Sequence, residues 1–375
     1  MPVSTAKKFF FKGVAYSPTP IGLYPFQSEL MDSNQPIWSR DLALMRAAGI
    51  NSIRVYNIPA PPNDTNLSIV SFLNAAWNNG NDPIYLLMDM SFSGNALTNA
   101  SQTASIAQQF HDLDQKYAQY PAVMGVAIGN ELEIATPSAY GNPAWWTGFN
   151  AVAKAAKQGF IDGGAPDKIV TTSEEDNIPA IVVSGESNGA AIDAWGLNIY
   201  RGRTFTNLFS ELQADTTKPV LITEYGTSSA YHPGTGSTYS YTPTPTGSGS
   251  CTMGSGATSV TDVAELPAAG NPNIAGLVDY LANNETLLYT QFTSTGTVSG
   301  GFAFEWTDEW WKAGINNPSI HDGDVNPVPY VPGCNIDNGW YGLNSVAQNP
   351  GGRPDVLTAR PTFQALSQLW QSQSF

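Results

Sequence analysis

Charged side chains are scarce in this sequence, and basic ones are the scarcest. Only 13% of the 375 residues are charged, and 16 basic residues face 31 acidic ones, which gives a net charge of -15. A chain with so little positive charge is poorly suited to neutralise the phosphates of a nucleic acid or an anionic membrane surface. We therefore expect neither as a partner.

Long apolar runs are also missing. No run of about 18 apolar residues is present, so the sequence predicts no membrane insertion. The opening residues, MPVSTAKKFFFKGVAYS, include lysines but no apolar core of a signal peptide, and none is expected in this chain. A processed exported protein would look the same.

Metal-binding residues are few and scattered. The three histidines and two cysteines have no spacing typical of a metal site, so the sequence predicts no metal and no other cofactor. Cys251 and Cys334 both fall in loop-like segments and form one disulfide or remain two thiols. A disulfide favours a secreted or periplasmic protein, with a cytoplasmic location left open.

What the sequence does contain is a regular alternation of strand-like and helix-like segments. Such alternation is typical of βαβ units and a parallel sheet. Eight units predict a (β/α)8 TIM barrel, with its active site at the carboxyl ends of the strands. An open, doubly wound sheet is the alternative, but the Gly-rich phosphate loop expected of it is missing. The predicted strands are 10–16, 51–56, 83–89, 122–130, 168–174, 193–200, 218–224 and 298–306.

Two long insertions interrupt this alternation. They occupy 225–274, after the seventh strand, and 307–358, after the eighth. The first contains TPTPTGSGSCTMGSGATS, which in isolation resembles a linker between domains. Because the barrel pattern resumes after it, we interpret both insertions as active-site loops and residues 1–375 as a single catalytic domain. A disulfide between the two cysteines would join these loops.

Two glutamates mark the candidate catalytic site. Glu131 follows the fourth strand in VAIGNELEIA, and Glu224 ends the seventh in KPVLITEYG. Strands four and seven of a closed eight-stranded barrel face each other across its mouth, so the two carboxylates can converge on one ligand. Paired carboxylates that flank a glycosidic bond are the requirement of glycoside hydrolysis. A polar strand end that only meets solvent is the alternative for either glutamate alone.

The pair predicts a retaining mechanism with distinct roles. One protonated carboxyl donates to the leaving oxygen while the other attacks the anomeric carbon, at a separation of about 5–5.5 Å. We expect Glu131 to be the acid/base and Glu224 the nucleophile. Asn130, beside the acid, is placed to hold the sugar 2-hydroxyl.

Several motifs together resemble a known family. The strand ends GNE and TEYG are similar to those of the clan A retaining glycosidases. FKGVAYSP, RDLALMRAAGINSIRVYNI, DAWGLNIY, ITEYG, SGGFAFEW and GWYGL resemble glycoside hydrolase family 72, the β-1,3-glucanosyltransferases, from about residue 10 to residue 345. The resemblance implies a retaining transglycosylase or glycosidase that acts on a β-glucan oligosaccharide or polysaccharide.

The resemblance also implies roles for residues near the pair. Tyr200 would hydrogen-bond to the nucleophile, and Arg54 would keep it ionised or simply tie strands together. Tyr56 and Asp89 would line the sugar subsites, as would Glu305. This chain departs from the family at Ser39, where members usually have a cysteine.

Aromatic side chains supply the apolar surface of a carbohydrate site. Flat rings stack on the apolar face of a sugar, and we expect Trp306 to form the floor of the site. Trp310, Trp311, Trp340 and Tyr341 are each as compatible with packing. Trp145 and Trp146 are expected in the core.

Other functions compete with this one. The same pair of glutamates would serve another clan A enzyme, such as a β-1,4-glucanase or mannanase. A catalytically inactive barrel that only binds carbohydrate would be supported if the two carboxylates lay more than about 8 Å apart or were blocked by the insertions. An aldolase-type barrel is disfavoured, because no lysine ends a predicted strand to form a Schiff base.

Overall fold

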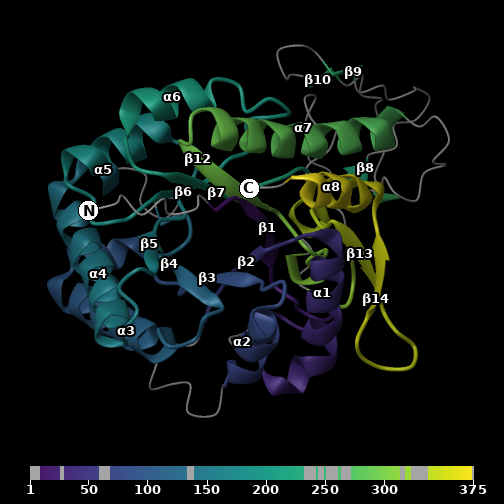
Figure 1. Cartoon of the computed structure of the whole chain (residues 1–375), viewed down its shortest axis with the longest axis horizontal. Helices are drawn as coiled ribbons and strands as arrows, with labels where there is room; N and C mark the ends of the chain where they lie inside the picture. The colour runs from purple at the N-terminus through teal and green to yellow at the C-terminus, as the bar shows by residue number, and fades with distance from the viewer. Residues whose placement is uncertain are drawn as a thin grey trace.

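The structure is a computed structural model, and it describes residues 9–25, 29–58, 68–132, 139–231, 242–243, 249–250, 261–262, 272–312, 317–321 and 337–373. Strands and helices alternate along these residues (Figure 1). The two cysteines lie outside the described residues, so the predicted disulfide stays a prediction.

Eight parallel strands form the central sheet, in the order β5-β4-β3-β2-β1-β12-β7-β6. Backbone bridges from Thr171 to Ala194 and from Glu174 to Leu197 connect the two ends of this order, so the sheet closes. The predicted (β/α)8 barrel is confirmed, and the open sheet is wrong. The strands are β1 Phe11–Tyr16, β2 Ser52–Val55, β3 Tyr85–Asp89, β4 Val123–Ala127, β5 Ile169–Thr171, β6 Trp195–Asn198, β7 Val220–Tyr225 and β12 Val298–Ala303.

Helices surround this ring (Figure 1). Local sequence signals set their ends: Gly49 ends α1 with a left-handed φ of 84°, which glycine adopts without steric cost. The Asn99 side chain accepts hydrogen bonds from two backbone amides at the start of α3. The helices are α1 Gln35–Ala48, α2 Val70–Trp77, α3 Ala100–Tyr117, α4 Pro143–Asp162, α5 Ser184–Ser187, α6 Leu208–Asp215, α7 Pro272–Ser294 and α8 Pro361–Ser372.

Alternate residues of the strands face different cores. Leu86 and Met88 of β3 join the large cluster between strands and helices, whereas Leu87 packs inside the ring with Ala127 and Phe302. This period of two is the property of an extended strand. The inside of the barrel is therefore filled by side chains. Trp145 and Trp146 are buried in the large cluster, as expected.

The insertions contain short strands of their own. In the first, β8 Ala230–Tyr231 pairs with β11 Thr261–Asp262, and β9 Thr242–Pro243 pairs with β10 Gly249–Ser250. In the second, β13 Asn344–Ala347 and β14 Val356–Ala359 form an antiparallel pair.

A buried ion pair fastens the second insertion to the barrel. The Arg360 guanidinium contacts both carboxylate oxygens of Asp308, at 2.8 and 2.7 Å. Arg360 and Asp308 are 1% and 3% exposed. The backbone amide of Gly342 also donates to Asp308, at 3.0 Å. The segments before and after β13 and β14 are thereby held together.

Glu285 of α7 is a second kind of buried carboxyl. It is fully buried, and the Tyr225 hydroxyl donates to its Oε2 at 2.7 Å. Burial raises the pKa of Glu285 to about 7. In contrast to Asp308, its Oε1 has no hydrogen-bond partner among the described residues.

Among the described helices, none is long and apolar enough to cross a membrane.

Candidate active site

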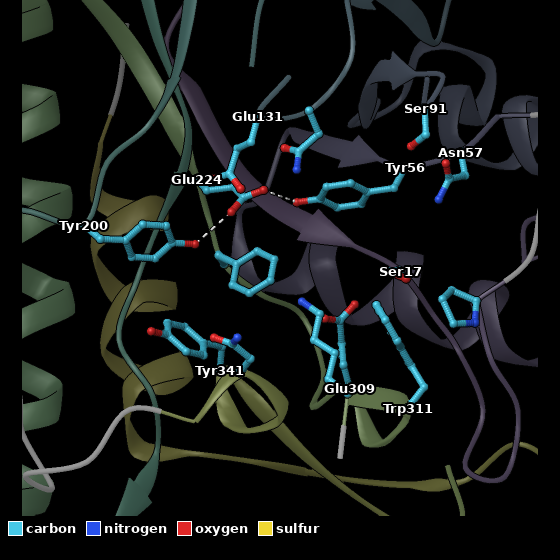
Figure 2. Close-up of a pocket in the computed structure, with 15 residues that line it drawn as sticks. Ser17, Tyr56, Asn57, Ser91, Glu131, Tyr200, Glu224, Glu309, Trp311 and Tyr341 are labelled. Atoms are coloured by element: carbon cyan, nitrogen blue, oxygen red, sulfur yellow. Dashed lines mark hydrogen bonds and ion pairs between the residues drawn. The ribbon is translucent and has the colours of Figure 1, made fainter. Parts of the chain in front are cut away.

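A pocket of about 440 Å³ opens at the carboxyl ends of the barrel strands. This is the end of a (β/α)8 barrel where strand-following loops meet. Figure 2 shows polar side chains from several strands directed into it. The lining residues are Ser17, Pro25, Tyr56, Asn57, Ser91, Asn130, Glu131, Tyr200, Glu224, Phe304, Glu309, Trp311, Lys312, Asn338 and Tyr341.

Glu224 is held by three donors, two from β2 and the residue after it and one from the segment after β6. Its Oε1 accepts from Arg54 Nη1 at 2.7 Å and from the Tyr56 hydroxyl at 2.9 Å. Its Oε2 accepts from the Tyr200 hydroxyl at 2.8 Å (Figure 2). Burial, together with the Glu224 charge, raises the pKa of Tyr56 and of Tyr200 well above the ordinary value. Both tyrosines are therefore neutral donors, and the three contacts fix the carboxylate and stabilise its negative charge.

Arg54 lies beneath the pocket and is fully buried. Its Nη2 contacts Asp89 at 3.3 Å and Asn130 Oδ1 at 2.6 Å. Burial opposes its charge, but Tyr56 and the Glu224 and Asp89 carboxylates more than offset this effect, so the Arg54 pKa is raised. Burial raises the pKa of Asp89 to about 6, although the guanidinium opposes the shift. The guanidinium stays charged and links β2, β3 and β7 below the cavity.

Glu131 enters the pocket from a turn with unusual backbone angles. Gly129 and Glu131 have φ of 73° and 47°, in the left-handed region that side-chain-bearing residues seldom adopt. The Glu131 amide donates to the Ser173 carbonyl at 2.7 Å, which holds the turn against the segment after β5. This turn directs both Asn130 and Glu131 into the pocket, and it ends the strand at Ala127, earlier than predicted.

Asn198 connects the two candidate catalytic glutamates. Its Nδ2 donates to Glu131 Oε1 at 3.0 Å, and its Oδ1 accepts from Arg54 at 3.3 Å, the same guanidinium that holds Glu224. The Thr223 hydroxyl donates to the same Oδ1 at 2.8 Å, which fixes the amide. The two carboxylates thus belong to one hydrogen-bonded network.

The Asn130 amide has a defined orientation. Its Oδ1 accepts from Arg54 at 2.6 Å, from Asn198 Nδ2 at 3.2 Å and from the Ser173 hydroxyl at 3.4 Å. With the oxygen occupied by these donors, the NH2 group is left to face the pocket that Asn130 lines. A ligand hydroxyl is a suitable acceptor for it.

Most of the predicted site residues line the pocket, and the others lie outside its lining. Tyr56, Asn130, Glu131, Tyr200 and Glu224 line the pocket. Four predicted residues are buried and do not line it: Arg54, Asp89, Glu305 and Trp306. Asp89 points to Arg54, so its expected place in a sugar subsite is corrected to a supporting position under the cavity.

Trp306 is also corrected. It is 1% exposed, belongs to the large core cluster and packs edge-on against Phe363 of α8, with ring centroids 5.3 Å apart. The aromatic walls of the pocket are instead Phe304, Trp311 and Tyr341. A tryptophan that follows a strand can pack on either side of it, and the partner on α8 is distant in the sequence.

Two features of the site escaped sequence reasoning. Asn198 was missed, although it precedes Tyr200 by two residues and so shares its face of the strand. Lys312, which lines the pocket as the partner of Glu309, was also missed, because it lies in a short 3-10 helix, Trp310–Lys312, that has no periodic signal. Within the described part of the chain, no group of His, Cys, Asp or Glu residues is arranged to hold a metal ion.

A (β/α)8 barrel with glutamates from β4 and β7 in one pocket defines the class of barrel enzymes that act on glycosidic bonds. Comparison with known proteins narrows this class. The sequence pattern of the glucanosyltransferases, glycoside hydrolase family 72, matches residues 1–232. The chain belongs to this family, as the sequence motifs predicted.

Relatives in the family share modest identity. The 1,3-beta-glucanosyltransferase PGA4 of Candida albicans is 25% identical over 239 residues, covering 59% of this chain and 49% of that protein. The 1,3-beta-glucanosyltransferase GAS2 of Saccharomyces cerevisiae is 22% identical over 252 residues, covering 59% of this chain and 41% of that protein. The chain therefore matches about half or less of these relatives.

Solved structures confirm the fold. Saccharomyces cerevisiae Gas2p in complex with laminaripentaose superposes with a TM-score of 0.58 at 16% identity, covering 98% of this chain and 66% of that one. A GH2 beta-galacturonidase from Eisenbergiella tayi gives the same TM-score at 14% identity, covering 98% of this chain and 51% of that one. Such low identities concern the fold alone.

Proposed function

We propose that this protein is a retaining transglycosylase or glycosidase that acts on a β-1,3-linked glucan through a covalent glycosyl-enzyme. The family and the names of its relatives support the substrate class, and the pocket supports the chemistry. Glu224 is the proposed nucleophile and Glu131 the proposed acid/base.

The reaction has two steps. In the first, a Glu224 oxygen bonds to the anomeric carbon while the bond from that carbon to the leaving sugar oxygen breaks, and the Glu131 proton goes to the leaving oxygen. In the second, Glu131 takes a proton from an incoming hydroxyl, whose oxygen displaces Glu224 from the same carbon. Each step inverts the configuration, so the product retains it.

One observation carries this assignment: a guanidinium and two tyrosine hydroxyls donate to Glu224. Three such donors fix the direction of a carboxylate, which a nucleophile needs. Glu131 has a different environment, in which the Asn198 amide donates to its Oε1 at 3.0 Å. Two carboxyls in one pocket with different surroundings are suited to different protonation states.

The incoming hydroxyl decides between transfer and hydrolysis. A sugar acceptor gives a longer glucan, whereas water gives hydrolysis. The glucanosyltransferase names of the relatives favour transfer. A β-1,4-glucanase or mannanase remains an alternative for the same pair of glutamates, as does a barrel that only binds carbohydrate.

The first experiment follows linear β-1,3-gluco-oligosaccharides by mass and anomeric configuration, with β-1,2-, β-1,4- and β-1,6-linked ones in parallel. We expect longer products with retained configuration from the β-1,3-linked series. Shorter products alone would identify a hydrolase. Turnover of only another linkage, or of none, would contradict the proposed substrate.

Variants at the two glutamates test their roles. Glu224→Gln should lower turnover by about 10⁴-fold or more, as expected when a nucleophile is removed. Azide should restore reaction of an activated donor in Glu224→Ala with an inverted product, and in Glu131→Ala with a retained one. The opposite configurations would exchange the two roles. Near-normal rates in Glu224→Gln would exclude it as the nucleophile.

We extend the proposal to the whole chain. A glucan is the expected partner, and residues 1–375 are proposed to form a single catalytic domain. Export to the cell surface or beyond is the location that fits a polysaccharide substrate.

A further inference from the structure

The segment that follows β12 forms one wall of the pocket with three side chains. These are Glu309, Trp311 and Lys312, and all three lie beyond the residues that match the family pattern. Figure 2 shows Glu309 and Trp311 across the cavity from Glu131. The comparisons therefore give them no role, although they face the same space as the two glutamates.

Lys312 is a charged donor with spare capacity. Its ammonium pairs with the Glu309 carboxylate and lies 4.7 Å from the centroid of the Phe304 ring and 5.2 Å from that of Trp311. Glu309 is its one carboxylate partner within the described residues. An ammonium has three N–H donors, so two remain for a ligand in the pocket.

Glu305 is a second, buried carboxyl near this ion pair. It is 1% exposed, and burial together with the Glu309 charge raises its pKa well above the ordinary value. A raised pKa favours the neutral form of Glu305, which limits its repulsion of the Glu309 carboxylate.

Stability is a poor explanation for this arrangement. Removing two charges from water costs about as much as their attraction returns, so a buried ion pair is weak evidence for a stabilising role. The side chains of Glu309 and Lys312 are 4% and 26% exposed, and both residues line the cavity. Binding of a polar ligand explains the presence of this ion pair in the pocket better than packing does.

The order of strands around the barrel indicates which part of a ligand this wall meets. β12 is the neighbour of β7, which carries Glu224, whereas β1, β2 and β3 separate it from β4, which precedes Glu131. After the first step, the sugar that stays on the enzyme is bonded to Glu224, and the sugar that leaves is the one protonated by Glu131. A wall beside β7 faces the retained sugar.

We propose that Glu309 and Lys312 form a donor-sugar subsite, in which the ammonium donates to hydroxyls of the retained glycosyl unit and the carboxylate accepts from them. This inference rests on the proposed function and adds which side chains select the donor sugar.

The chemistry of the wall defines the ligand class. A sugar hydroxyl both donates and accepts, so a Lys–Glu pair matches two neighbouring hydroxyls, while Trp311 and Phe304 offer apolar surface to ring carbons. The Lys312 charge is already balanced by Glu309, and Glu131 and Glu224 face the same cavity. The pocket therefore favours a neutral glycosyl unit over a uronic acid.

The binding test uses Glu131→Gln, which should stop turnover and leave the Glu224 network intact. Laminaripentaose is titrated into this variant by calorimetry, with and without Lys312→Met. Loss of a charged hydrogen-bond donor should raise Kd by about 10- to 100-fold. Glu309→Gln, which keeps the shape of the side chain, should also weaken binding and give a second measurement.

Lys218→Met is the matched control. Lys218 pairs with Glu186 at 2.7 Å and is 25% exposed, close to the 26% of Lys312, but it does not line the pocket. It should change Kd by less than about twofold, and the unfolding midpoints of all variants should show that they fold. Equal Kd values for the Lys312 and Lys218 variants would overturn the subsite.

A kinetic measurement separates the donor side from the acceptor side. With Glu131 intact, Lys312→Met should raise the donor KM and leave the ratio of transfer to hydrolysis unchanged, because that ratio is set after the donor is bound. A changed ratio with an unchanged donor KM would overturn the assignment to the donor side. If the unaltered protein neither binds nor converts β-1,3-glucans, the proposed function fails, a result distinct from equal Kd values.

Discussion

Two buried arginines of this barrel meet carboxylates in different ways. Arg360 and Asp308 form a two-point contact with distances of 2.8 and 2.7 Å, and neither residue lines the pocket. Arg54 divides its donors, with Glu224 at 2.7 Å and Asp89 at 3.3 Å, and its Nε has no hydrogen-bond partner among the described residues. The contact with Arg360 satisfies both carboxylate oxygens of Asp308, whereas Arg54 keeps one donor, Nε, without a partner among the described residues.

The difference shows that burial of an ion pair alone does not reveal its purpose. A two-point contact satisfies both partners and fixes one geometry, which suits a joint between segments. Divided contacts leave one carboxylate, Glu224, directed into a cavity. A protein accepts incompletely satisfied polar groups mainly where it has a use for them.

The largest predicted effect comes from breaking the pocket arginine. Arg54→Met removes a charged donor from Glu224 and leaves Asp89 buried without its partner, so kcat should fall by about 10³-fold. Turnover of β-1,3-gluco-oligosaccharides measures it, with circular dichroism as the control for folding. A loss of less than tenfold in a folded variant would contradict the role of Arg54 beneath Glu224.

Arg360→Met is the counterpart and should affect stability instead. Removing one partner of a buried pair leaves an uncompensated charge, and the free energy of unfolding should fall by about 3–5 kcal/mol. Denaturant unfolding measures this change, and kcat per folded molecule should stay within about tenfold. A loss of kcat equal to that of Arg54→Met would contradict the assignment of a stabilising role to Arg360 and a catalytic one to Arg54.

Glu285 extends the comparison to a buried carboxyl without an arginine. Its pKa is raised from 4.5 to about 7 in the folded state, so the folded protein binds more protons than the unfolded chain between these values. Its contribution to stability is therefore present below about pH 4.5 and lost as the pH rises to 7, by on the order of 3 kcal/mol. Glu285→Gln should flatten unfolding free energy over this range, as chemical denaturation at several pH values can test. If the unfolding free energy of the variant depended on pH as that of the unaltered protein does, groups other than Glu285 would determine this dependence.

The smallest predicted effect concerns one donor of the pocket network. Tyr200→Phe removes a single hydroxyl from Glu224 Oε2, while Arg54 and Tyr56 still hold Oε1. We expect kcat to fall by about tenfold, the order of one neutral-to-charged hydrogen bond. A loss as large as that of Arg54→Met would show that the tyrosine contributes more than one contact.

The sequence predicted the features that depend on local pattern. Strand-length apolar runs separated by helical periods specify a barrel, and a polar residue at the end of such a run lies at its mouth. Glu224 was found in this way because it ends a predicted strand, whereas Tyr200 and Tyr56 were expected from the family resemblance. The turn at Gly129 placed Glu131 in the pocket as well, although the strand ends four residues before Glu131, at Ala127.

Features that depend on distant contacts were not predictable. Trp306 packs on Phe363, and no local signal distinguishes this from a tryptophan that stacks on a sugar. Asp89 ends β3 as expected, but its side chain contacts Arg54 beneath the cavity and does not enter the cavity. Lys312 lies in a short 3-10 helix, where the side-chain direction follows from the packed structure and not from a period.

The position of Arg54 in the chain has a consequence for folding. Its contact with Glu224 spans 170 residues of sequence, whereas its contact with Asp89 spans only 35 and joins neighbouring strands. During folding, short separations close first because they lose less chain entropy. Asp89 can thus pair with the guanidinium before β7 joins the sheet and brings Glu224 to it. Asp89→Asn should then slow refolding more than it speeds unfolding, a difference that stopped-flow kinetics would measure.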